Sequence, residues 1–351
     1  MGLPNILIEF KQTASTAIKR GERGVVAVMV IEAVEAVTVT KIEDVLQVPK
    51  DLTAANKAYI ERIFLGGKGP VKYVQMVKAD SVENALEKLE TFKFDYLAAP
   101  PAVTSDEATE IATYIKTMRD SKGLKVKAVL PNTKADHEGI INFTTENIVV
   151  GKDTYSAAEY CSRIAGILAG TPLNVSSTYF VLPEVDDVPK FTKSDMNKKI
   201  DAGELVLYHD GEKVKIAREV NSLQDANNLK GDIYKSIKVV DTMDLIYNDI
   251  HGTIEDNYIG KYPNNYDNKL LLVVSIQTYL EALRDDEILD ADIFVGIDVE
   301  AQRDWLRENG VDVSEMSEQD IKEANTKSEV FIAGSYHILY AIEDVAVKFN
   351  I

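Results

Sequence analysis

Between residues 24 and 169 the sequence alternates strand-like and helix-like segments. Apolar runs such as VVAVMVIE (25–32) and VKYVQMVKA (71–79) are typical of buried strands. SVENALEKLETF (81–92) has helical spacing instead, with Ser81 at the position of an N-cap. Strands and helices in this alternating order predict a largely parallel sheet with helices on its faces.

The alternation stops near residue 180. PEVDDVPKFTKSD (183–195) is acidic and contains two prolines, so it reads as a connection, and ELVLYHDGEKVKIARE (204–219) predicts a hairpin that turns at Asp210-Gly211. NKLLLVVSIQTYLEALRDDE (268–287) predicts a long helix. Its apolar face would consist of Val273, Ile276, Leu280 and Leu283.

We therefore predict an α/β fold, α+β overall, in which a mixed sheet is flanked by helices and a smaller C-terminal α+β domain follows. Extended strand arms are predicted at both ends of the chain. The predicted limits are an N-terminal arm (1–20), an α/β domain (21–230), a C-terminal domain (231–327) and a C-terminal arm (328–351).

Both ends of the chain show the period of two that is typical of a half-buried strand. The apolar positions are Ile6, Ile8 and Phe10 at one end and Val345, Val347, Phe349 and Ile351 at the other. An unpaired apolar strand edge promotes association, so each end either completes a sheet of its own chain or pairs with another molecule. The pattern alone favours the first arrangement and leaves the second open.

Charge and composition exclude several classes of protein. With a net charge of −18, the chain lacks the basic surface that nucleic-acid binding requires. The most apolar stretch, residues 24–34, is too short to span a bilayer and contains Glu32. Residues 1–12 lack a basic segment followed by an apolar one, so we predict no signal peptide and synthesis in the cytoplasm. The single cysteine, Cys161, lies in a predicted amphipathic helix and is expected to be buried.

A search for catalytic, cofactor and metal motifs finds none. FLGGKGP (64–70) lacks the spacing of a phosphate loop and fits a helix end followed by a turn. Glu184, Asp186 and Asp187 lack the spacing of a calcium loop. The four histidines, His137, His209, His251 and His337, form no zinc motif. We predict no catalytic residue, no cofactor, no metal and no enzymatic activity.

Three stretches carry a family resemblance. EANTKSEVFIAGSYHILYAIEDVAVKFNI (323–351), with AIEDV at its centre, resembles the C-terminus of contractile phage tail sheath proteins. NYIGKYPNNYDNKLLLVVSIQTYLEALRDDEIL (257–289) is similar to the same family. DVEAQRDWLRENGVDVSEMSEQDIKEANT (298–326) resembles the small sheaths of Gram-positive myophages, defective prophages and R-type, diffocin-like bacteriocins.

The resemblance implies a structural protein that forms stacked hexameric rings around an inner tube and contracts to drive the tube through a bacterial envelope. In such sheaths the terminal arms of neighbouring subunits pair into a shared sheet. Ile6, Ile8, Phe10, Val345, Val347, Phe349 and Ile351 would then be inter-subunit strand residues. The alternative is a cytoplasmic α/β enzyme or small-molecule binding protein whose terminal strands complete its own sheet.

The resemblance also implies partners. They are other copies of the chain, the inner tail tube protein, and baseplate and tail terminator or collar proteins, with no nucleic acid and no membrane contact. In the family, tube contacts come from the C-terminal domain, so Arg303 and Arg307, four residues apart, are candidates for a basic face toward an acidic tube; a solvated helix face is the alternative. The expected location is the bacterial host cytoplasm during assembly and then the tail of the released phage or bacteriocin particle.

Overall fold

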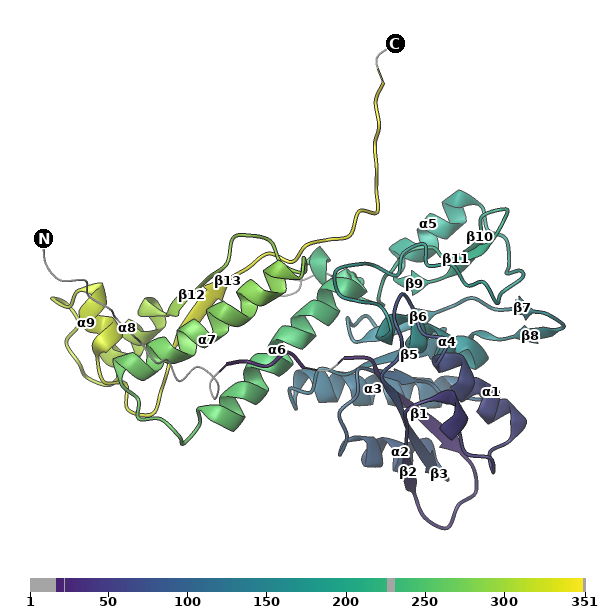
Figure 1. Ribbon diagram of the computed structural model, residues 1–351, viewed down its shortest axis with the longest axis horizontal. Coiled ribbons are helices and arrows are strands. Elements are labelled where there is room, and N and C mark those ends of the chain that lie inside the picture. The colour runs from purple at the N-terminus through teal and green to yellow at the C-terminus, as the bar shows by residue number, and fades with distance from the viewer. Residues whose placement is uncertain (1–16, 22, 226–230, 350–351) are drawn as a thin grey trace, which may run out of the picture. The chain divides into compact units, whose positions relative to one another are not determined.

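The described residues form two compact units. The computed structural model describes residues 17–21, 23–225 and 231–349 (Figure 1). The larger unit comprises the described residues of 22–245 and 340–351, and the smaller unit those of 1–21 and 246–339. Helix α6 (Ile237–Asn257) begins in the larger unit and continues into the smaller one.

A seven-stranded sheet forms the centre of the larger unit, in the order β2-β3-β1-β4-β5-β6-β9. Only the pairing of β2 with β3 is antiparallel, so the predicted mixed, mainly parallel sheet is confirmed. The strands are β1 (Val25–Ile31), β2 (Thr38–Ile42), β3 (Tyr73–Ala79), β4 (Tyr96–Ala98), β5 (Lys127–Pro131), β6 (Ile140–Phe143) and β9 (Glu204–Leu205).

Four helices pack on this sheet, and each begins where the sequence supplies a hydroxyl cap. They are α1 (Ala54–Ile63), α2 (Val82–Leu89), α3 (Ser105–Asp120) and α4 (Ala157–Ala169). Their caps are Thr53, Ser81, Thr104 and Ser156, each of which accepts a hydrogen bond from the backbone N–H three residues later. Cys161 of α4 is fully buried as predicted, and burial raises the pKa of its thiol.

Smaller elements complete the larger unit. The predicted hairpin is confirmed as β10 (Leu207–His209) paired with β11 (Val214–Ile216), and Gly211 in its turn has a φ of +111°. A second hairpin pairs β7 (Ile148–Val150) with β8 (Asp153–Tyr155). Helix α5 (Lys193–Asp201) begins in the segment that was expected to be only a connection. Two short 3₁₀ helices are Val45–Gln47 and Asp232–Lys235.

The smaller unit combines helices with a two-stranded sheet. After α6 come α7 (Tyr266–Asp285), β12 (Phe294–Ile297), α8 (Val299–Glu308), α9 (Glu318–Glu323) and β13 (Ile332–Ser335), with β12 and β13 antiparallel. The predicted apolar face of α7 is buried. Among the described residues, no helix combines the length and apolar composition needed to cross a bilayer.

The division into units and the predicted domain limits are not the same. The units divide within α6, whereas the sequence places the limit between residues 230 and 231. The predicted C-terminal arm also divides, because β13 lies in the smaller unit and residues 340–349 are grouped with the larger one. The domain limits therefore stay a prediction, and Ile6, Ile8, Phe10 and Ile351 lie outside the described residues.

Helices α1 and α4 meet at a glycine, and this contact can be tested. A Cβ added to Gly166 would lie 2.4 Å from the backbone oxygen of Ile63, so Gly166→Ala forces two helix backbones apart. We expect it to lower the free energy of unfolding by about 1–3 kcal/mol. Gly252→Ala in α6 is the matched control. Apart from its chain neighbours and the adjacent backbone of α6, no described atom lies within 4 Å of its added Cβ, and about 0.4–1 kcal/mol of stabilisation is expected. Equal unfolding midpoints in urea for the two variants would contradict this account of the α1–α4 contact.

Candidate functional site

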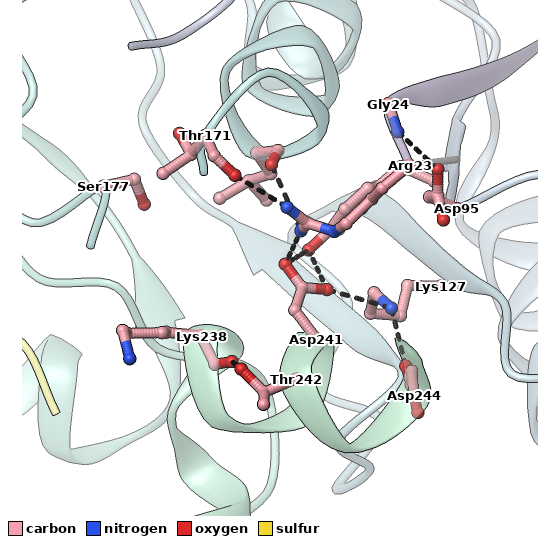
Figure 2. Close-up of polar contacts among 12 residues, drawn as sticks. Arg23, Gly24, Asp95, Lys127, Thr171, Ser177, Lys238, Asp241, Thr242 and Asp244 are labelled. Carbon is pink, nitrogen blue, oxygen red and sulfur yellow. Dashed lines mark hydrogen bonds and ion pairs between the residues drawn. The ribbon is translucent and has the colours of Figure 1, made fainter. Parts of the chain in front are cut away.

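The first part of α6 is held against the sheet by buried charges (Figure 2). Asp241 and Asp244 both face Lys127 of β5, whose Nζ lies 3.0 Å from Asp241 Oδ1 and 2.6 Å from Asp244 Oδ2. Arg119 of α3 donates to both oxygens of Asp244 at 2.8 and 2.9 Å. Arg23, just before β1, pairs with Asp241. The aspartates, Lys127 and Arg119 have side chains no more than 8% exposed, so water provides little screening here.

Hydrogen bonds extend this charge network to the neighbouring elements. The Tyr96 hydroxyl of β4 lies 2.7 Å from Asp241 Oδ1, and Arg23 also donates to the backbone oxygen of Thr171 at 2.6 Å. The backbone N–H groups of Gly24 and Val25 both donate to Asp95 at 2.8 Å. One cluster therefore fixes α6 to β1, β4, β5 and the end of α4.

Three positive side chains of the network pair with three acids. Glu138 lies 3.6 Å from Arg119, so Arg23, Arg119 and Lys127 face Asp241, Asp244 and Glu138. Burial by itself would raise the pKa of Asp244, but the adjacent positive charges of Lys127 and Arg119 outweigh it and hold that pKa below the ordinary value. Removing one partner would leave another buried charge without compensation, which is strongly destabilising.

A group of possible metal ligands lies beside this network. Asp120, His137 and Glu138 bring their donor atoms within 4.8 Å of one another. However, His137 Nδ1 accepts a hydrogen bond from Gly139 N–H at 3.0 Å, which places the proton of the neutral ring on Nε2, 3.2 Å from Asp120 Oδ2. A metal would need the lone pair of that nitrogen, so the group fits a hydrogen-bonded histidine and not a metal centre. Glu184, considered above as a cation ligand, pairs with Arg163.

The C-terminal segment is exposed. Residues 340–349 contain no strand. Val345, Val347 and Phe349 are 73%, 67% and 83% exposed. Figure 1 shows this part of the chain as an extended trace. The half-burial predicted from the alternating pattern is thus absent in the single chain, and the described part of the segment completes no sheet of its own chain.

The small sheet of the smaller unit has unpaired edges. Strands β12 and β13 pair only with each other among the described residues, and Phe294 of β12 is 63% exposed. Each outer edge presents backbone N–H and C=O groups without a strand partner. A two-stranded sheet is marginally stable by itself.

Arg303 and Arg307 lie on α8, as the sequence predicts a helix there. Both line an open hollow of about 750 Å³ whose other walls come from residues 310–314 and Met316. Arg307 pairs with Asp304 at 2.9 Å, whereas Arg303 has no ion-pair partner in the described part of the chain. Both arginines therefore lie at the same hollow. Their predicted contact with the tube protein is not tested by the structure of a single chain.

Comparison with known protein families agrees with the resemblance. The family model of the phage tail sheath protein central domain matches residues 75–222, and that of the phage tail sheath C-terminal domain matches residues 230–351. The chain belongs to the phage tail sheath family. This sheath chain is 40% identical over 355 residues to the tail sheath protein of Clostridium phage phiCD119, with 99% of each chain covered.

Solved structures share the fold of this sheath chain. The sheath tail protein of Desulfitobacterium hafniense superposes with a TM-score of 0.70 at 17% identity, covering 95% of this chain and 100% of that one. The helical sheath of the anti-feeding prophage, solved in its contracted state, gives a TM-score of 0.73 at 14% identity over 100% and 99% of the two chains. The predicted family and fold class are confirmed, and the enzyme alternative gains no support.

Sequence reasoning missed the charges that hold α6 in the sheath protein. Asp241 and Asp244 stand three residues apart within the largely apolar run VVDTMDLI, and Lys127 lies within the predicted strand LKVKAVLP. Charged residues inside buried patterns are nearly always paired, so these charged residues were the available signal. They do not reveal which charges meet, because the partners lie more than one hundred residues apart.

The network predicts a large effect of Asp244→Asn. This variant leaves Lys127 and Arg119 without one of their buried partners, and we expect it to lower the free energy of unfolding by about 3–5 kcal/mol. Asp304→Asn, which disrupts the exposed pair with Arg307, is the control and should change it little. Urea unfolding at pH 7 measures the unfolding free energy of both variants. Similar losses of unfolding free energy in the two variants would contradict the prediction that the buried pair stabilises the fold more than the exposed one.

The same residue predicts a pH dependence. The folded-state pKa of Asp244 is lower than the unfolded value, near 3.8, so its stabilisation is present above 3.8 and is lost as the pH falls through the folded pKa. The wild-type chain should therefore lose more unfolding free energy than Asp244→Asn between about pH 5 and pH 2. Parallel curves for the two chains would contradict the lowered pKa.

Proposed function

We propose that this chain is a structural, non-enzymatic subunit of a contractile tail sheath. It polymerises as stacked hexameric rings around an inner tube and contracts to drive the tube through a bacterial envelope. The full-length relationship to a phage tail sheath protein carries this proposal. The absence of strand pairing in residues 340–349 supports it, because an exposed alternating apolar segment fits an inter-subunit contact better than a finished monomer.

Neighbouring subunits are connected by their terminal strands. Val345, Val347 and Phe349 of one subunit, with Ile351, pair with a neighbour, and so do Ile6, Ile8 and Phe10. The unpaired edges of the β12–β13 sheet are suitable receivers, because added strands satisfy backbone groups and enlarge a marginal sheet. Donor and receiver are different surfaces, so the contact is heterologous and builds rings and helical polymers.

Contraction requires contacts that exchange while others persist. Exposed charged residues such as Arg307 and Lys122 are suited to subunit contacts that exchange, because an exposed ion pair is worth only about 0–1 kcal/mol. The contacts made by the terminal strands are the ones that persist in both states. No step in this scheme consumes a nucleotide.

Other partners follow from the same role. Arg303 and Arg307 face the inner tube protein across the hollow beside α8, where exposed positive charge is suited to acidic groups. Baseplate and tail terminator or collar proteins contact the ends of the polymer. Assembly takes place in the bacterial host cytoplasm, after which the sheath is part of the phage or bacteriocin particle, without nucleic-acid or membrane contact by this chain.

Deleting residues 345–351 tests the strand connection. Because the described side chains of this segment are exposed, the unfolding midpoint should remain that of the full chain, while sheath polymers disappear from negative-stain electron micrographs. The full chain should form hollow tubes or stacked six-fold rings, with tube protein and baseplate added if needed. Persistent globular particles of the full chain under those conditions would refute the proposed function.

Replacing both Arg303 and Arg307 with Ala tests the tube contact. We expect weaker co-sedimentation of sheath with tube protein in low salt and a smaller salt dependence, because two positive charges are lost. Arg284→Ala, at an exposed pair with Asp285 on α7, is the control and should bind as the wild type does. Tube binding that is unchanged in the double variant would exclude these arginines from the interface.

A further inference from the structure

Glu343 of the AIEDV stretch is bound by side chains of the larger unit. One oxygen of Glu343 accepts hydrogen bonds from the hydroxyls of Ser176 and Thr178, each at 2.7 Å. Its other oxygen lies 3.1 Å from Nε of Arg218. Three donors therefore converge on one carboxylate, and the arrangement is partly protected from water because the Glu343 side chain is only 25% exposed.

The residues on either side of Glu343 contrast with it. Asp344 also pairs with Arg218, but its side chain is 85% exposed. Ile342 and Val345 are 90% and 73% exposed. Glu343 is thus the point where the segment is held, and exposed apolar residues lie on both sides of it.

A second set of hydrogen bonds fixes the loop whose hydroxyls bind the Glu343 carboxylate. The backbone N–H of Glu219 donates to the Thr178 hydroxyl at 3.0 Å, and the Glu219 carboxylate accepts from both the N–H and the hydroxyl of Ser177. Glu219 also accepts from the backbone N–H of Lys238 in the first turn of α6. The loop that holds Glu343 is therefore fixed to the start of α6.

We propose that Ser176, Thr178 and Arg218 form a seat for the Glu343 carboxylate, and that this seat sets where and in which direction the C-terminal strand leaves the subunit. The proposal rests on the proposed function, since the strand is taken to pair with a neighbour. A strand held at its root loses less freedom on pairing than a loose one, so the seat preorganises the inter-subunit contact. It also passes tension on the strand to α6 and the sheet.

The seat can be measured in the unassembled full-length chain by electron-spin distance measurements. Nitroxide labels at Glu212→Cys, in the β10–β11 turn, and Ala346→Cys, beyond Glu343, report the direction of the strand within the larger unit. Cys161 is fully buried and will not react with the label. Glu343→Gln removes the charge at nearly unchanged shape, and Asp344→Asn makes the same charge change at the exposed neighbour.

We expect Glu343→Gln to broaden the distance distribution, with about a tenfold or greater loss of the seated state, because hydrogen bonds to a charged group are lost. Asp344→Asn should have a clearly smaller effect. The yield of sheath polymer should fall more in Glu343→Gln than in Asp344→Asn, and the unfolding midpoints of both variants should equal that of the wild type. Together these results would support the seat.

Two results would overturn it. A distribution that stays narrow in Glu343→Gln, or that broadens equally in Asp344→Asn, would show that no specific seat exists. A broad distribution with a wild-type yield of polymer would show that the seat does not position the strand for assembly. Failure of the wild-type chain to polymerise with tube protein and baseplate present would instead refute the proposed function, and the distance measurement would still test the seat.

Discussion

The pairing of Asp241 and Asp244 with Lys127, Arg119 and Arg23 is the interaction on which the rest of the molecule depends. It places three positive charges and their acids where water is excluded, so the group is stable only as a complete set. The ion pairs fix the first turns of α6 to the sheet of the larger unit. An apolar contact at this place would be tolerant of small slips along the helix, whereas paired charges define one register.

The start of α6 serves a second purpose. Glu219 accepts from the backbone of Lys238 there and also orders the loop of Ser176 and Thr178. Two features far apart in the sequence, the first turn of a helix and the root of the C-terminal segment, are therefore parts of one hydrogen-bonded group. The root of the segment is therefore connected to α6 by directed hydrogen bonds.

The elements with strong periodicity could be predicted from the sequence, and those fixed by tertiary contacts could not. Strand β1 and helix α7 carry long apolar patterns, and the β10–β11 turn has the Asp-Gly pair that such turns favour. Helix α5 has no buried residue, so it leaves no apolar stripe to recognise, and strand β9 has only two residues. The sequence also cannot predict that residues 345–349 are exposed in the single chain. An alternating pattern shows that one face of a strand is buried, but not which molecule covers that face.

The position of the exposed apolar segment near residue 345 also bears on the order of synthesis and folding. Residues 345–349 are translated after residues 23–339, and domains generally fold as units in the order in which they emerge. The sheet, the charged base of α6 and the loop of Ser176 and Thr178 can all be complete before the strand leaves the ribosome. This exposed apolar segment emerges after the residues that hold its root, so the body has time to fold first, and that order limits the time available for aggregation.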